Sequence, residues 1–423
     1  MKKNSIALMF YVLNSFILLG QTNKATQEEN FITKWTNFNP KNTFYPEVTN
    51  ILEGSISENY TLTSDKTYLL KGTVYVTNNA TLTIEPGTII RGDDNTCGTL
   101  VVTKGSKIIA NGNQNNPIVF TSNKESAIRK PGDWGGVIIL GDANTNKFGG
   151  VNFLELDLDK KFSMYGGTDN TSDSGILNFI RIEYSGRKLI RQSKELNGLS
   201  LAGVGSKTKI SNIQVSYSND DSFEFYGGTL EASNLISYRA TDDDFDFTQG
   251  AQINLSSSIA IRNPYSSDAS RSRCFEIDTY DNKETADLSK PITHVKATKV
   301  VFVNIEQNDQ GLVKEAIYIS DNAKLELKNS VISGFRSGVN LNQNINLNSE
   351  DIEKIDIQNC IINDCLYLAE KETYVDYKDF IIYFSNEKYK NRLKSLDKKE
   401  LFVNPEISSN PDFRIRKENI TNY

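Results

Sequence analysis

Short runs of β-branched and apolar residues alternate with turn-forming residues along most of the chain, from Tyr68 onward. Each run has the length of a strand and is bounded by asparagine, aspartate, glycine or serine, which suit tight turns. The first such runs are Thr73–Val76, Thr81–Ile84, Thr99–Val102, Ile118–Phe120 and Val137–Leu140. Because no long segment in this region has helical spacing, the pattern predicts an all-β protein.

An internal repeat narrows this prediction to one architecture. The segment Asp220–Phe225 recurs 22 residues later as Asp242–Phe247, and Phe275–Ile277 is a looser third copy. A run of 22 residues has a contour length of about 73 Å, which is enough for one three-sided coil. An antiparallel sandwich would not require such self-similarity. The repeat therefore favours a parallel β-helix, in which each strand lies on its counterpart one coil later.

Stacking of this kind predicts which side chains point into the coil and which point outward. Successive residues of a strand point to opposite faces of the sheet. We therefore expect Phe223 and Phe225 to point into the coil and Glu224 to point outward, with Phe245 and Asp246 repeating the arrangement one layer on.

The two ends of the chain differ from its middle. Residues 1–20, with Lys2 and Lys3 before an apolar run, predict a signal peptide. We expect residues 21–60 to form an N-terminal extension that plugs the first coil, and residues 61–370 to form the β-helix. Residues 371–423 are expected to form a C-terminal cap, with a helix over Ser385–Glu400.

Composition excludes several classes of function. The net charge is −6 and the pI is near 5.2, so no basic surface is available for nucleic acid. Without Lys2 and Lys3 the chain has 45 basic and 53 acidic residues, a charge of −8. The single histidine, His294, excludes any zinc site that needs two imidazoles. We expect a monomer without a membrane-spanning segment, located outside the cell, at its surface or in the periplasm.

Cysteine supplies little chemistry here. The spacing of the four cysteines matches neither a disulfide framework nor a CxxC metal site. We expect buried thiols, with one bridge at most. The residues are Cys97, Cys274, Cys360 and Cys365.

Several motifs give the chain a family resemblance. They include Leu82–Thr88 (LTIEPGT), Gly132–Gly136 (GDWGG), Arg181–Tyr184, Glu195–Leu199 and the Asp220 segment. With these motifs the chain resembles secreted and surface proteins of Bacteroidota that have a right-handed parallel β-helix, the fold of pectate lyases. The resemblance implies the fold and does not imply catalytic residues.

Acidic residues of the repeat are the strongest chemical signal. Carboxylates on adjacent coils would lie about 4.8 Å apart and repel one another, which a Ca²⁺ ion with its six to eight oxygen ligands would relieve. The alternative is that the side chains spread into solvent and the aspartates form Asx turns. The predicted Ca²⁺ ligands are Asp220, Asp221, Asp242, Asp243 and Asp244.

A ligand-binding role is predicted for charged residues beside this cluster, namely Glu224, Asp246, Glu276, Arg239 and Arg262. The favoured function is non-catalytic binding of polysaccharides, cell-surface glycans or other surface partners. The alternative is an enzyme that acts on acidic polysaccharide. It would be a polysaccharide lyase with an arginine or lysine as base, for which Arg239 and Arg262 are candidates, or a glycoside hydrolase with paired aspartates such as Asp220 and Asp221. Trp134 could stack on a sugar, but the glycines beside it favour a corner that packs inward.

Overall fold

The computed structural model describes residues 30–189, 194–268, 271–306, 311–320, 322–347, 350–371 and 377–420. Its contacts divide the chain into two units, Met1–Asn30 and Phe31–Tyr423, and all features below belong to the second. The predicted signal peptide, residues 1–20, lies outside the described residues.

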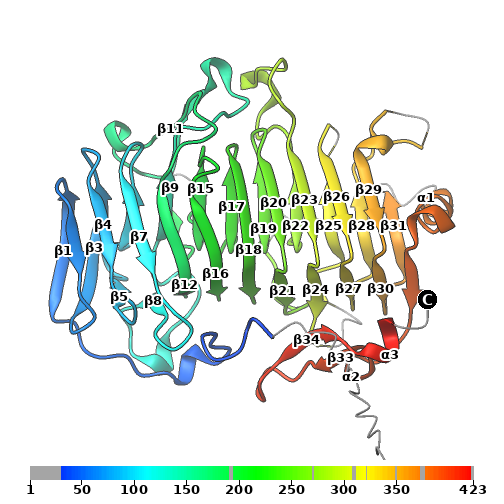
Figure 1. The fold of residues 1–423 in the computed structure, drawn as a ribbon, viewed down its shortest axis with the longest axis horizontal. Coiled ribbons are helices and arrows are strands. Elements are labelled where there is room, and N and C mark those ends of the chain that lie inside the picture. The colour runs from blue at the N-terminus through cyan, green and yellow to red at the C-terminus, as the bar shows by residue number, and fades with distance from the viewer. Residues whose placement is uncertain are drawn as a thin grey trace, which may run out of the picture. The chain divides into compact units, whose positions relative to one another are not determined.

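Strands of the second unit wind into a stack of three-sided coils, so that one continuous sheet contains 28 strands among the described residues. Figure 1 shows the coils side by side. All strand pairs within this sheet are parallel, as in β17–β19 and β18–β20. The predicted all-β, right-handed parallel β-helix is therefore confirmed, and its strands extend from Asn50 to Lys394, beyond the predicted 61–370 at both ends.

Each coil has three faces, which we call A, B and C. Face A contains β6 (Thr99–Val102), β9 (Gly136–Leu140), β15 (Leu199–Ala202), β17 (Phe223–Tyr226), β19 (Phe245–Thr248), β22 (Phe275–Ile277), β25 (Glu315–Ile319), β28 (Ser337–Leu341) and β31 (Tyr367–Lys371). Face B contains β2 (Tyr60–Leu62), β4 (Thr81–Ile84), β7 (Lys107–Asn111), β20 (Gln252–Ser256), β23 (His294–Thr298), β26 (Lys324–Lys328) and β29 (Ile355–Gln358). Face C contains β5 (Ile89–Gly92), β8 (Ile118–Ser122), β21 (Ile259–Arg262), β24 (Val301–Asn304), β27 (Val331–Ser333), β30 (Ile361–Asn363) and β32 (Arg392–Lys394).

Five longer strands bend from one face to the next. The bend in β18 falls at Asn234, whose φ of 57° is left-handed, and asparagine tolerates that region better than most residues. Its Nδ2 donates to Asn212 Oδ1 of the previous coil at 3.0 Å. The bending strands are β1 (Asn50–Ile56) and β3 (Thr67–Val76), between faces C and A, and β12 (Gly175–Glu183), β16 (Lys209–Ser216) and β18 (Thr229–Tyr238), between faces B and C.

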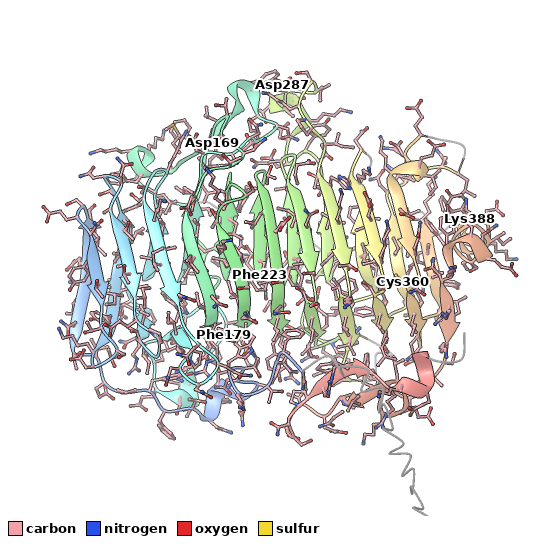
Figure 2. The ribbon with its side chains drawn as sticks, viewed as in Figure 1. Asp169, Phe179, Phe223, Asp287, Cys360 and Lys388 are labelled. Carbon is pink, nitrogen blue, oxygen red and sulfur yellow. The ribbon has the colours of Figure 1, made fainter. Side chains whose placement is uncertain are left out.

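Phenylalanine stacks in the interior confirm the predicted register. Phe223 lies over Phe245 with ring centroids 5.0 Å apart, and Phe225 lies over Phe247 at 4.9 Å. All four side chains are buried. Figure 2 places Phe223 within the coil stack.

From β18 onward, face C is apolar on its outer side as well, and the N-terminal segment covers part of this surface. Trp35, which is fully buried, packs edge-on against Phe179, and Phe38 packs against Tyr238. The prediction that this segment plugs the first coil is wrong, because these aromatic residues find a larger apolar surface on the side of middle coils. We call residues 31–49 the strap.

The C-terminal cap begins with α1 (Tyr377–Phe384). Its Phe380 and Phe384 are buried in the main core. The helix predicted over Ser385–Glu400 is wrong: Arg392–Lys394 instead forms β32 on β30, since a sheet edge offers backbone partners that outweigh helix propensity. The chain continues through α2 (Lys398–Leu401), the antiparallel hairpin of β33 (Phe402–Asn404) and β34 (Asp412–Ile415), and α3 (Lys417–Ile420). Phe402 and Phe413 of the hairpin pack into the apolar cluster on the outer side of face C.

Two further expectations concern single side chains. Trp134 is fully buried and donates to the Glu183 carbonyl at 2.8 Å, so it packs inward and offers no platform to a sugar. All four cysteines are free; Cys274 and Cys360 are buried, and the other two are half-buried.

Candidate functional site

The outer side of face A carries a row of polar residues. Ser200, Glu224, Asp246 and Glu276 are aligned on β15, β17, β19 and β22. Because phenylalanines on either side of Glu224 fill the interior, alternation along the strand directs this carboxylate outward, as predicted.

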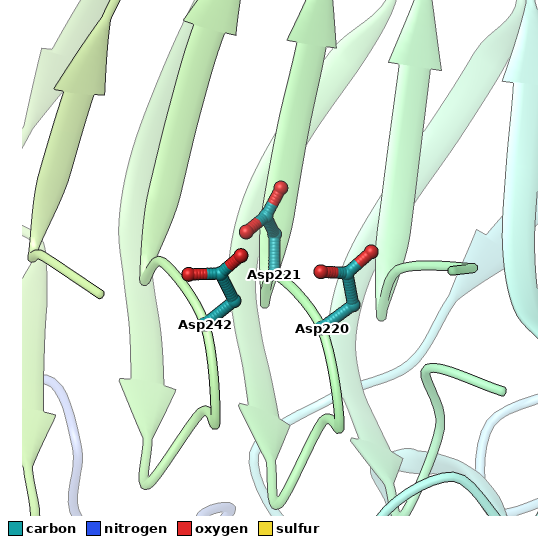
Figure 3. Close-up of side chains that lie close together, drawn as sticks. All are labelled: Asp220, Asp221 and Asp242. Atoms are coloured by element: carbon teal, nitrogen blue, oxygen red, sulfur yellow. The ribbon is translucent and has the colours of Figure 1, made fainter. Parts of the chain in front are cut away.

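Turns that lead into β17 and β19 add three more carboxylates. Asp220 and Asp242 are half-buried, and Asp221 is 6% exposed. Figure 3 shows Asp221 between the other two. Their carboxylate oxygens lie within 4.8 Å of one another, and so do those of Asp221, Glu224 and Asp246. Asp221 thus belongs to both groups, which together we call the acidic cluster.

Neighbouring polar groups fix parts of the acidic cluster. Glu224 Oε2 accepts hydrogen bonds from Asn197 Nδ2 and the Tyr226 hydroxyl. Asp221 Oδ1 accepts from the backbone nitrogen of Asp243 at 3.0 Å. Two buried oxygens have no hydrogen-bond partner among the described residues, namely Oδ1 of Asp246 in the cluster and Oδ1 of Asn197, whose Nδ2 donates to Glu224.

Burial dominates the electrostatics of the acidic cluster. It raises the pKa of Glu224 to about 7 and that of Asp242 to about 6, with nearby carboxylates adding to the effect. The pKa values of Asp220, Asp221 and Asp246 are also raised well above the ordinary range, first by burial and then by neighbouring charges. Because Asp221 is buried and the other side chains of the cluster are half-buried, the alternative of side chains spread into solvent does not describe this site.

Such a cluster can relieve its repulsion in two ways. Two unit charges 4.8 Å apart repel by about 3.5 kcal/mol at an effective dielectric of 20. The carboxyls can retain protons, or a cation can bind between them. The ligand atoms are all oxygens, which suits a hard cation such as Ca²⁺. Asp220, Asp221 and Asp242, or Asp221, Glu224 and Asp246, could hold it.

Two of the predicted Ca²⁺ ligands have other roles. Asp243 Oδ1 accepts from the backbone nitrogen of Arg273, and Asp244, fully buried, accepts from the Ser237 hydroxyl and pairs with Arg262. Neither belongs to the two carboxylate groups. We therefore leave Asp243 and Asp244 out of the candidate cation site.

Arg262 lies inside the protein and is closed off from a ligand at the surface. This side chain is fully buried, lies 3.4 Å from Asp244, and donates to the carbonyl oxygens of Asp242, Arg273 and Ser266. The prediction that it contacts a ligand is wrong, because Arg262 holds together the turns of adjacent coils.

Arg239 and Glu276 have partners of their own. Arg239 pairs with Glu306 at 3.1 Å and lies over the Tyr238 ring. Glu276 continues the polar row of face A and accepts from Arg273 at 2.5 Å. Of the five residues predicted to bind a ligand, only Glu224 and Asp246 belong to the acidic cluster.

Sequence reasoning missed Asn197 and Tyr226, both of which donate to Glu224. Tyr226 directly follows the repeated Phe-Glu-Phe segment and could have been found by extending the strand alternation. Asn197 lies in a turn of the preceding coil, and only its alignment with the repeat would have revealed it.

A family model for a pectate-lyase-like β-helix domain matches residues 54–398, which is more than half of the chain. The chain belongs to this family. The match agrees with the three-faced coils of this pectate-lyase-like β-helix protein and covers the whole acidic cluster. No curated protein and no solved structure matches the chain.

Among the described residues of this β-helix protein, no helix has both the length and the apolar character to span a bilayer.

Proposed function

We propose that this protein is secreted or held at the cell surface, where it binds glycans through face A without catalysis, with a Ca²⁺ ion in the acidic cluster. The observation that carries the proposal is the position of Asp221, which is shared by two groups of three carboxylates whose oxygens lie within 4.8 Å. A cation at this point neutralises several half-buried acids at once.

Coordination chemistry links the ion to a glycan. Ca²⁺ takes six to eight oxygen ligands, whereas each group supplies three carboxylates. Asn197 Oδ1, which has no protein partner among the described residues, is available as a further ligand atom. The remaining positions are open to water or to the hydroxyl and carboxylate oxygens of a sugar.

Calorimetric titration with Ca²⁺ and thermal melts test the cation site. We expect heat of binding and a rise in melting temperature for the wild type, and loss of both in Asp221→Asn, which disables both groups. Asp169→Asn, in an exposed loop (Figure 2), is the matched control and should behave as wild type. Absence of heat and of a melting shift at millimolar Ca²⁺ would rule out the site.

Affinity electrophoresis in gels that contain acidic polysaccharides tests the glycan. Retardation should require Ca²⁺ and should disappear in Asp221→Asn. Retardation that persists with chelator, or in the variant, would argue against binding through the cluster.

Glycoside hydrolysis of an acidic polysaccharide is the second candidate, and Glu224 favours it. Its pKa of about 7 lets this carboxyl hold a proton beside Asp246, as a general acid must. A lyase has less support because Arg262, one of the two arginines considered as its base, is fully buried. Release of reducing ends that is lost in Glu224→Gln and Asp246→Asn would establish hydrolysis; no release from a panel of acidic polysaccharides would leave binding as the function.

A further inference from the structure

Face B carries a groove on its outer side, away from the acidic cluster. This cavity of about 540 Å³ crosses β16, β18, β20, β23 and β26. The volume lies within the range of ligand sites in proteins. Neither the strap nor the C-terminal hairpin is among its lining residues.

Small hydroxyl residues form the floor of the groove. Ser211, Ser233, Ser256 and Thr298 are aligned on four successive strands. In the next layer the same row continues with Lys328, whose long side chain ends the floor. The short side chains therefore create a trough that runs along the coil axis.

A second row of longer polar side chains borders this floor. Glu231, Asn254 and Lys296 are aligned on β18, β20 and β23, and Lys209 precedes them on β16. All four side chains are exposed. Adjacent layers are about 4.8 Å apart, so a ligand lying along the groove meets a new polar group at each layer.

Polar groups in the middle of the groove lack protein partners. No hydrogen bond or ion pair to a described residue involves the side chains of Ser233, Ser256, Thr298, Lys209, Glu231, Asn254 or Lys296. At the end of the groove the situation differs: Lys328 pairs with Glu326 and Asp356, and Glu326 also pairs with His294. The middle of the groove thus retains unused donors and acceptors.

Charge and shape decide what such a groove can take. Three lysines and two glutamates line it, so the charges nearly cancel and neither a polyanion nor a polycation is favoured. Its lining contains no aromatic ring for stacking a base or a planar ligand. Hydroxyls both donate and accept, which matches a ligand that is itself rich in hydroxyl groups.

We propose that this groove on face B binds one strand of a neutral, hydroxyl-rich polysaccharide, lying along the coil axis over Ser211, Ser233, Ser256 and Thr298. This site is separate from the acidic cluster and does not rest on the function proposed for it. Binding at face B requires no Ca²⁺.

Affinity electrophoresis with neutral linear glucans, mannans, galactans and xylans, in the presence of chelator, tests the proposal. At least one of these polymers should retard the wild type. Ser256→Tyr fills the floor and should abolish retardation, whereas the Ser233→Ala/Ser256→Ala pair should weaken binding about tenfold through lost hydrogen bonds. Thr83→Tyr, on face B at β4 and outside the groove, is the matched control and should bind as wild type.

The outcomes separate the two sites. Retardation by a neutral polymer that survives Asp221→Asn but not Ser256→Tyr supports the groove, whatever the fate of the acidic cluster. No retardation by any neutral polymer, retardation by acidic polymers alone, or equal retardation of Ser256→Tyr and wild type would overturn the proposal. Melting curves of each variant confirm that the chain remains folded.

Discussion

At the scale of single residues, burial decides the chemistry of the charged groups. Glu224 and Asp246 point outward from face A, yet both are half-buried, so water is partly excluded and their pKa values rise. Arg262 and Asp244 are both fully buried and compensate each other. Charged residues that look equivalent in the sequence therefore serve different purposes.

Stability should depend on pH through Glu224. Its folded pKa of about 7 lies above the ordinary glutamate value of about 4.3, so the folded chain binds the proton more tightly than the unfolded chain. This contribution is complete below the ordinary pKa and is lost as pH rises to about 7. With chelator present, Glu224→Gln should reduce the fall in melting temperature over this interval. An identical pH profile in wild type and variant would contradict the assignment.

Arg262 and Arg239 form a matched pair for testing burial. Arg262→Ala leaves Asp244 buried without its cation and should lower the free energy of unfolding by about 3–5 kcal/mol. Arg239→Ala removes only a partly exposed ion pair with Glu306 and should cost no more than about 1 kcal/mol. Denaturant titration measures both; equal costs would show that Arg262 is not structural.

At the scale of elements, the three faces share one inward pattern and differ on the outside. Face A carries the acidic cluster, face B is polar and grooved, and face C is apolar from β18 onward, where the strap and the C-terminal hairpin pack on it. In β21 every residue is buried because the outer side chains Ile259 and Ile261 join the cluster that contains the strap. Strand formation is thus common to all faces, and the outward residues assign each face its role.

Helix α1 protects the C-terminal end of the core, and two of its residues test this role. Phe384→Ala removes a fully buried side chain and should cost about 3–5 kcal/mol. Ile382→Ala, at a position 70% exposed on the same helix, should stay within about 0.5 kcal/mol of wild type. Chemical denaturation compares the two; a neutral Phe384→Ala would mean that the helix does not close the core.

At the scale of the whole second unit, the strap contacts coils that are far from it in the sequence. Asn37 exchanges hydrogen bonds with Gln214 at 2.7 and 2.9 Å, and the Tyr45 hydroxyl donates to the buried Glu183 at 2.9 Å. In a solenoid each coil otherwise contacts only its neighbours. The strap therefore adds long-range contacts that join the unfolding of several coils.

Trp35→Ala should weaken this connection. Loss of its buried ring should cost about 3–5 kcal/mol and expose the strap to protease before the coils are cut. Phe44→Ala, at a strap position 86% exposed, should change neither stability nor the order of cleavage. Proteolysis followed by mass spectrometry distinguishes these results, and simultaneous loss of strap and coils would show that the strap has no separate stability.

The repeat alone determined the β-helix and its register. The 22-residue spacing predicts Phe223 over Phe245 and Glu224 beside Asp246, because residues at the same phase of a coil must stack, and the structure has this register. Alternation along each strand then separated interior from exterior. Local pattern and tertiary structure agree here since both follow the same periodicity.

Only the tertiary structure decided the contacts between residues that occupy different positions around the coil. Asp243 and Asp244 follow Asp242 directly, yet turn geometry sends them to a backbone nitrogen and to a buried arginine. The strap packs on the side of the coils, where Trp35 contacts Phe179. Residues 392–394 form a strand because the edge of β30 was available for pairing. Such outcomes depend on which surfaces remain uncovered after the coils have formed, and no local stretch of sequence contains that information.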